Sequence, residues 1–193
     1  MNSQAKGNNQ LTMSGFSSFT DGQLAEAIKN SDSQAFKALY YRYYEKLFQF
    51  IWIRTRSTEL AKDLTQDVFT RFWNKRENLD PGQSIKAYLY RISNNLVINH
   101  YQHLKVERKY LSNLDADNFI AAPDDTFDLR DKITFEIERL PEKQRTVFIM
   151  HRFENFTYAE IARTLEVSVK TVEKRMSEAL RILRLKLAKF VTK

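Results

Sequence analysis

Basic residues gather near the C-terminal end of the chain in a pattern that suits contact with DNA. Residues 168–193 hold eight Lys and Arg against two Glu, a net +6 in a chain whose total is +7. On a helix, cations and hydroxyls within the first two turns can reach base edges or phosphates in a major groove. A solvated basic face is the alternative, and the spacing favours DNA binding. The residues concerned, opposite the apolar stripe, are Ser168, Lys170, Thr171, Lys174 and Arg175.

A second polar group follows residue 85 and mixes amides, aromatic rings and cations. Amides can read base edges and rings can stack on unpaired bases, which is what single-stranded DNA or RNA requires. A surface helix with some core tyrosines explains the same segment equally well. The group comprises Lys86, Tyr88, Tyr90, Arg91, Asn94, Asn95, Asn99, His100, Tyr101, Gln102 and His103.

Two carboxylates and an amide, Asp63, Gln66 and Asp67, share one face of a predicted helix. Paired carboxylates can serve acid–base catalysis or bind a metal, but no His lies near them in the sequence. A solvated helix face is one explanation. A protein-docking face, with Phe69 and Trp73 as anchors on an adjacent side, is the other.

Composition excludes several kinds of chemistry. The 193 residues include no Cys, which excludes disulfides, thiol catalysis and thiolate zinc sites and fits a reducing cytoplasm. The four Gly are not clustered as a phosphate-cradling loop requires, and the three His lack metal-ligand spacing. We therefore expect no catalytic residue, no metal, no cofactor and no small-molecule substrate. No apolar run approaches the roughly 20 residues of a membrane span, and no signal segment opens the chain.

The elements that must position these groups are helices, since apolar residues recur at three-to-four spacing and Gly and Pro are few. Residues 1–20 read as a flexible tail. A short helix begins near Asp21, and a long one follows with Lys37, Arg42, Lys46 and Arg54 on its far side. Ser57 and Thr58 cap a third helix, and a fourth runs from about Ser84 toward Lys109. Between the last two, Asp80-Pro81-Gly82 predicts a turn in which Gly accepts a positive φ.

The composition of the chain changes after about residue 111. Residues 112–131 hold six Asp against one base, Arg130, and their periodicity fades, which indicates a linker. Beyond it, Pro141 suits a first helical position. Thr157 and Glu160 fit a capping box before a helix that ends at Leu165. Ser168 then caps a last long helix, whose predicted apolar seam is Val169, Val172, Met176, Leu180, Leu183 and Leu187.

The short helix, the turn and the basic helix form a helix-turn-helix pattern. Glu166 stands in that turn where Gly is common, at a cost on the order of 1 kcal/mol for a left-handed conformation. The fold class we predict is all-α. Its parts are a tail (1–20), a helical domain (21–110), an acidic linker (111–131) and a helix-turn-helix domain (132–193).

Four stretches, in order, resemble the bacterial RNA polymerase sigma factors of the extracytoplasmic-function group of the sigma-70 family. The first is AFKALYYRYY, residues 35–44. The second is DLTQDVF, residues 63–69, with Phe72 and Trp73. The third is KAYLYRISNNLVINHY, residues 86–101. The fourth joins residues 140–145 to FTYAEIARTLEVSVKTVEKRMSEALRILR, residues 156–184.

The resemblance implies roles for the polar groups. It implies a core-polymerase docking surface at Asp63, Gln66, Asp67, Phe69 and Trp73. It implies −35 element contacts by Ser168, Lys170, Thr171, Lys174 and Arg175. Near the loop before the fourth helix a flipped −10 base would be held, with contacts from Lys86, Tyr88, Arg91, Asn94, Asn95 and Asn99. The acidic linker would thread toward the RNA exit path.

Three residues depart from the pattern of the group. Asp67 stands where Glu is usual, Asn99 where Asp is frequent, and Gln102 where Arg is frequent.

The resemblance thus predicts a cytoplasmic, non-enzymatic sigma factor. It would bind core RNA polymerase and promoter DNA and direct promoter recognition, melting and initiation. An anti-sigma factor at the inner membrane is a further partner common in the group. The alternative from the residues alone is a stand-alone helix-turn-helix regulator with an N-terminal sensing or dimerisation domain.

Overall fold

The computed structural model describes residues 16, 18–80, 82–110 and 129–191, and the structural statements below concern those residues. Most of the predicted tail and residues 111–128 of the predicted linker lie outside them. Every element among the described residues is a helix, which confirms the all-α class. None of these helices is both long and apolar enough to cross a bilayer.

The chain divides into two compact units, Met1–Val97 and Ile98–Lys193. The division falls within helix α5 (Ile85–Tyr110) and not after it. The domain limits drawn from the sequence therefore stay a prediction.

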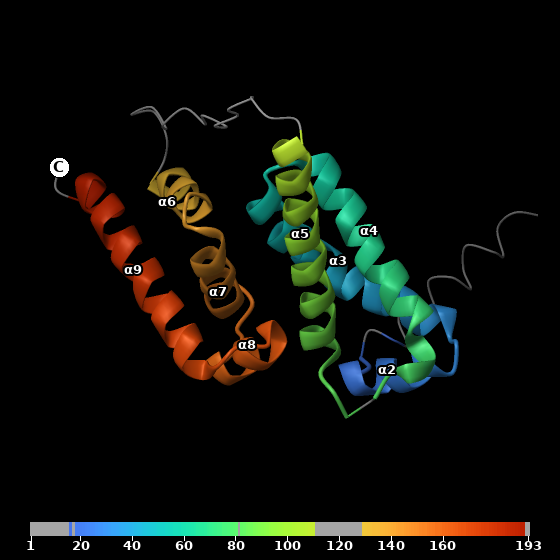
Figure 1. The fold of residues 1–193 in the computed structure, drawn as a ribbon. Helices are drawn as coiled ribbons and strands as arrows, with labels where there is room; N and C mark the ends of the chain where they lie inside the picture. Colours follow the sequence, from blue (N-terminus) through green and yellow to red (C-terminus); the bar gives the residue numbers. More distant parts are fainter. Residues whose placement is uncertain (1–15, 17, 81, 111–128, 192–193) are drawn as a thin grey trace, which may run out of the picture. The chain divides into compact units, whose positions relative to one another are not determined.

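The first unit is built on two long helices, α3 (Ser33–Thr55) and α4 (Thr58–Asn74), which pack against each other (Figure 1). A shorter helix, α2 (Asp21–Lys29), packs on α3, and a 3₁₀ turn (Arg76–Asn78) leads toward α5. Ser57 caps α4 as predicted, since its hydroxyl accepts the Leu60 amide at 3.3 Å. The core includes Leu24, Ile28, Leu39, Leu47, Phe50, Ile51, Val68, Phe72, Leu89 and Val97, all buried.

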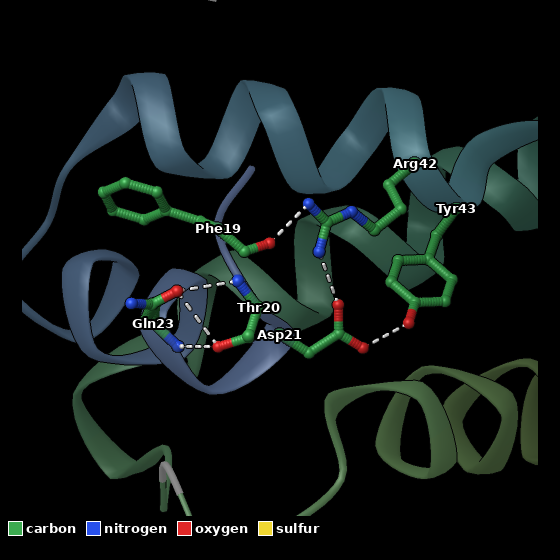
Figure 2. A network of polar contacts seen from close by, with 6 residues as sticks. All are labelled: Phe19, Thr20, Asp21, Gln23, Arg42 and Tyr43. Atoms are coloured by element: carbon green, nitrogen blue, oxygen red, sulfur yellow. Dashed lines mark hydrogen bonds and ion pairs between the residues drawn. The ribbon is translucent and has the colours of Figure 1, made fainter. Parts of the chain in front are cut away.

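A polar network fixes the start of α2 to the middle of α3 (Figure 2). Asp21 accepts a hydrogen bond from Arg42 at 2.8 Å on one oxygen and from the Tyr43 hydroxyl on the other. Arg42 also donates to the Phe19 carbonyl at 2.7 Å, and Thr20 with Gln23 forms a capping box. Arg42 therefore joins two helices, although the sequence placed it on the outer side of α3.

Another cation predicted on that outer side is buried. Arg54 is 1% exposed, and its guanidinium carbon lies 5.1 Å from the Phe50 ring centroid. The prediction that Arg54 lies on the outer side of α3 was wrong, because its side chain packs on Phe50 in the core of the unit.

The second unit contains α6 (Leu129–Glu138), α7 (Glu142–Arg152), α8 (Tyr158–Leu165) and α9 (Val169–Val191), and the first three pack on α9 (Figure 1). Helix α6 begins at Leu129, so its first three residues lie within the predicted linker. Pro141 is the N-cap of α7 and not its first helical residue. The limits of α8 match the prediction.

Left-handed backbone occurs at residues other than glycine. No described glycine has a positive φ, whereas Ser31, Arg56, Asn155 and Glu166 all do. The prediction for Gly82 was therefore wrong. Its turn is closed by Asp80, whose carboxylate accepts the Gly82 amide and whose carbonyl accepts the Gln83 amide, each at 2.9 Å.

Candidate nucleic-acid interface

The α8–α9 turn has the geometry of a helix-turn-helix. Thr157 and Glu160 form the predicted capping box: the Thr157 hydroxyl accepts the Glu160 amide at 3.3 Å, and the Glu160 carboxylate accepts the Thr157 amide at 2.8 Å. Glu166 is the C-cap of α8 and has a left-handed conformation (φ 54°, ψ 45°). Ser168 precedes α9 and caps it, since its hydroxyl accepts the Thr171 amide at 3.1 Å. These contacts confirm the predicted caps.

One side of α9 packs against the other helices of its unit, and the predicted DNA-contacting residues lie on the side that faces solvent. Val172, Met176, Ala179 and Leu183 are buried against the other helices of the unit. Val169, the first residue of α9, was predicted in this seam but is 43% exposed. Of the five predicted DNA residues, Ser168, Lys170 and Lys174 are exposed and Thr171 and Arg175 are half-exposed.

Side chains of α7 contact both α9 and the turn that leads to α8. Gln144 on α7 donates to the Glu178 carboxylate on α9 at 2.5 Å. Nδ1 of His151, at the end of α7, lies 2.8 Å from the Phe156 carbonyl, and its ring lies 4.9 Å from that of Tyr158. The turn between α7 and α8 is thus fixed by a side chain from each.

Some of the α5 residues predicted to contact the −10 element are accessible to solvent, and others are buried. Asn95 and Asn99 are exposed, and Lys86, Tyr88 and Arg91 are half-exposed. Asn94 is only 6% exposed, and its amide nitrogen lies 3.5 Å from Asn95 Oδ1, so it does not lie on the accessible face with the others. Tyr90 is fully buried, with its ring 5.0 Å from that of Phe50.

Two neighbouring depressions open where the loop before α5 meets the end of α4. The first, of about 200 Å³, is lined by Ala25, Lys75, Asn78, Leu79, Asp80, Gln83, Ser84, Ile85, Tyr88 and Arg91. The second, of about 350 Å³, is lined by Arg71, Lys75, Tyr88, Arg91, Ile92 and Asn95.

Sequence reasoning missed two residues of this region, Arg71 and Lys75. Both are exposed, and they stand one helical turn apart at the end of α4. That i, i+4 spacing of two cations, just before the Asp80 turn, was the signal that could have found them.

The predicted docking face on α4 is exposed except at one anchor. Asp63, Gln66 and Asp67 are exposed. Phe69 is 3% exposed, with its ring 4.6 Å from that of Tyr40, so it belongs to the core and is not a surface anchor in this conformation. Trp73 is half-buried.

Aromatic side chains of α3 pack against Phe69 and Trp73 of α4. The Trp73 ring lies 4.8 Å from Phe36, and the Arg76 guanidinium lies 4.6 Å from Trp73. Burial, together with the neighbouring phenols of Tyr44 and Tyr41, raises the pKa of Tyr40. Tyr40 therefore stays neutral well above physiological pH.

Within the described ranges, no three His, Asp or Glu side chains gather as a metal site would need. The sequence-predicted site residues lie in three places: on α5 and around the two depressions, on the α4 face and at the start of α9.

Comparison with known proteins accounts for both units. Residues 39–106 match the family description "Sigma-70 region 2", and residues 130–183 match "Sigma-70, region 4". The chain belongs to the sigma-70 family. The two regions occur in the order predicted from the sequence, and the relatives of the chain include sigma factors of the extracytoplasmic-function group.

Two relatives illustrate the likeness. The chain is 28% identical over 176 residues to RNA polymerase sigma factor YlaC of Bacillus subtilis, covering 86% of this chain and 96% of that protein. It is 27% identical over 173 residues to the ECF RNA polymerase sigma factor SigW of the same organism, covering 81% and 91%.

A solved structure shares the fold. The sigma factor RpoE of Bartonella quintana, solved in complex with the anti-sigma factor NepR, aligns with a TM-score of 0.69 and 22% identity. The alignment covers 82% of this sigma factor and 98% of that chain.

Proposed function

We propose that this sigma factor binds core RNA polymerase through α4 and recognises two promoter elements, one with each unit. The helix-turn-helix carries the proposal. Its caps and its buried seam turn Lys170, Lys174 and their neighbours to solvent at the start of α9. Helices presented in this way enter the major groove with their first two turns.

The first unit is proposed to serve the polymerase and the −10 element. Asp63, Gln66 and Asp67 would contact the polymerase, with Trp73 at the edge of that face. Unpaired DNA would be contacted by Lys86, Tyr88, Arg91, Asn95 and Asn99. Asn94 would not contact the DNA directly, because its side chain is buried. Trapping unstacked bases of one strand offsets the lost base pairing and so favours melting.

The chain itself would carry out no covalent chemistry, because polymerisation belongs to the polymerase. We place its action in the cytoplasm, where polymerase and promoters are found. Because RpoE of Bartonella quintana was solved with an anti-sigma factor, we propose a similar regulator for this chain. The stand-alone regulator is not favoured, since the N-terminal unit matches a sigma region.

Reconstituted transcription tests the proposal. The chain would be added to core RNA polymerase of its source bacterium with fragments of that genome as templates. We expect run-off transcripts that start at defined positions and that are absent without the chain. If no genomic fragment yields a specific transcript, the proposal is wrong.

A matched pair of variants tests the −35 contact in the same assay. Lys174→Ala should weaken promoter binding by roughly 1–3 kcal/mol if Lys174 meets a base. Lys186→Ala removes an exposed cation from the distal half of α9 and should have a smaller effect. Equal losses in the two variants would place the base contact elsewhere.

A further inference from the structure

Thr171 carries two groups that can meet a base, a hydroxyl and a methyl. A Thr hydroxyl can hydrogen-bond to several base edges, whereas a Thr methyl suits the C5-methyl group of thymine. The two groups therefore imply different base preferences for the same residue. Thr171 is half-exposed in the first turn of α9, and which group faces the DNA depends on how its side chain is held.

The hydroxyl of Thr171 is engaged within the helix cap. Its oxygen lies 2.8 Å from the hydroxyl oxygen of Ser168. The same Ser168 hydroxyl accepts the Thr171 amide at 3.1 Å, and the Ser168 carbonyl accepts that amide at 3.0 Å. Ser168 therefore holds both the backbone and the hydroxyl of Thr171.

Fixing the hydroxyl also fixes the methyl, because both are attached to Cβ of a β-branched residue whose χ1 is stiff. With Oγ1 held toward Ser168, the methyl occupies another of the staggered positions at Cβ. A group fixed in this way loses less conformational entropy on contact with DNA than the flexible side chains of Lys170 and Lys174. The methyl is thus the preorganised contact group of this turn.

The neighbours of Thr171 suit a major groove. Lys174 and Arg175 follow it at i+3 and i+4, so they lie beside it on the surface of α9. Both can bind phosphates or guanine. Val169 is 43% exposed, but residues two positions apart do not share a helix face. Thr171 therefore supplies the apolar contact among the five residues predicted to contact the −35 element.

We propose that Thr171 reads a thymine of the −35 element through its methyl group and not through its hydroxyl. The contact joins two methyl groups in the major groove, where thymine presents its C5-methyl. This inference rests on the proposed function. It adds a base preference, for thymine over uracil or cytosine, at the base pair that faces Thr171.

Deoxyuridine scanning of the −35 element tests the proposal with the assembled holoenzyme. Each thymine of the element, on either strand, is replaced in turn by deoxyuridine, which removes the methyl group and keeps the base pairing. Promoter binding is measured for wild type and for three variants. Thr171→Ser keeps the hydroxyl and deletes the methyl, and Thr171→Val keeps a methyl and deletes the hydroxyl. Val169→Ala shortens the exposed apolar neighbour and serves as the control.

In wild type, we expect one thymine whose replacement weakens binding about fourfold, as the loss of one buried methyl group should. Thr171→Ser should lose a similar factor on the natural promoter and nothing further when deoxyuridine stands at that position. Thr171→Val and Val169→Ala should keep the fourfold preference for thymine.

Any of four results overturns the inference. Wild type that tolerates deoxyuridine at every position has no methyl contact in the element. Thr171→Ser with the full preference, or Val169→Ala without it, would assign the contact to another residue. Thr171→Val without the preference would assign it to the hydroxyl.

Transcription by the same holoenzyme separates these results from a failure of the proposed function. If specific run-off transcripts persist in wild type, only the methyl contact is wrong. If wild-type holoenzyme neither binds the promoter nor yields transcripts, the proposed function fails with it.

Discussion

Glu166 connects α8 to α9 in a backbone conformation that favours glycine. With φ 54° and ψ 45°, its Cβ crowds the following carbonyl, at a cost of roughly 1–2 kcal/mol for an L-residue. The amide of Glu166 nonetheless bonds the Ala162 carbonyl and so closes α8. The helix-turn-helix therefore keeps its geometry through the packing of its helices and in spite of the local preference of this residue.

Glycine at this position should stabilise the second unit. We expect Glu166→Gly to exceed Glu166→Ala in free energy of unfolding by about 1 kcal/mol, because both lose the side chain and only glycine relieves the strain. Urea titration followed by circular dichroism measures the difference. Equal stability of the two variants would mean that the surrounding helices absorb the strain.

Caps could be predicted from the sequence because their chemistry is local. Thr157 with Glu160, and Ser168 with Thr171, need only a hydroxyl at the right spacing from a backbone amide, and both caps are present. Burial is not local in this way. Nothing within a helical turn of Asn94 or Phe69 indicates which neighbouring helix covers it, so both were predicted at the surface and both are buried.

At the scale of the element, α9 combines a recognition surface with the central packing surface of its unit. Helices α6, α7 and α8 all pack on it. The spacing of Val172, Met176 and Leu183 correctly predicted their place in the buried seam. Ala179 is also buried in this seam, although the sequence analysis did not include it. Ala179 was overlooked because a small side chain adds little to an apolar pattern.

Truncation in this seam should destabilise the second unit strongly. Met176 is 2% exposed, so Met176→Ala should cost about 2–5 kcal/mol through lost contacts and a cavity. Leu185 on the same helix is 64% exposed, and Leu185→Ala should change stability by less than about 0.5 kcal/mol. Chemical denaturation of both variants checks the contrast, and comparable losses would contradict the assigned orientation of α9.

Helix α6 was not predicted because its sequence alternates apolar and charged residues next to an acidic stretch. Ile137 and the following Leu140 are buried, yet Ile133 is 36% exposed. Helix α6 packs on α9, and this contact gives its apolar side chains a surface that the local sequence does not supply. Tertiary packing, and not intrinsic periodicity, accounts for this helix.

The exposed face of α4 makes a prediction of its own. Asp63→Ala with Gln66→Ala should reduce affinity for core polymerase while far-UV circular dichroism stays unchanged, because both residues are exposed and neither supports the core. Glu45→Ala, an exposed acid on α3, serves as the control. Normal assembly of the double variant would refute the proposed docking face.

At the scale of the molecule, the two units are proposed to act on two DNA elements through one covalent chain. Tethering makes the second binding event intramolecular and can raise overall affinity by about 10²–10⁴ without any new contact. Charge is distributed to match: residues 168–193 are net +6, whereas residues 112–131 hold six Asp against one Arg. A protease site inserted between residues 111 and 128 would separate the two contributions.

We expect cleavage at that site to weaken holoenzyme binding to a two-element promoter by at least about a hundredfold. The uncut insertion variant should bind as the natural chain does, and a promoter without a −35 element should respond little to cleavage. Filter binding or fluorescence anisotropy before and after cleavage measures the change. Undiminished binding after cleavage would show that the polymerase itself holds the units together.

The aromatic packing around Trp73 has a spectroscopic consequence. Both tryptophans of the chain, Trp52 and Trp73, belong to the first unit, and Trp73 lies against Phe36 and Arg76. Tryptophan emission therefore reports on the first unit alone, whereas helical ellipticity sums over both. If the units melt separately, the two signals will give different midpoints on the same sample, and emission will identify which transition belongs to the first unit.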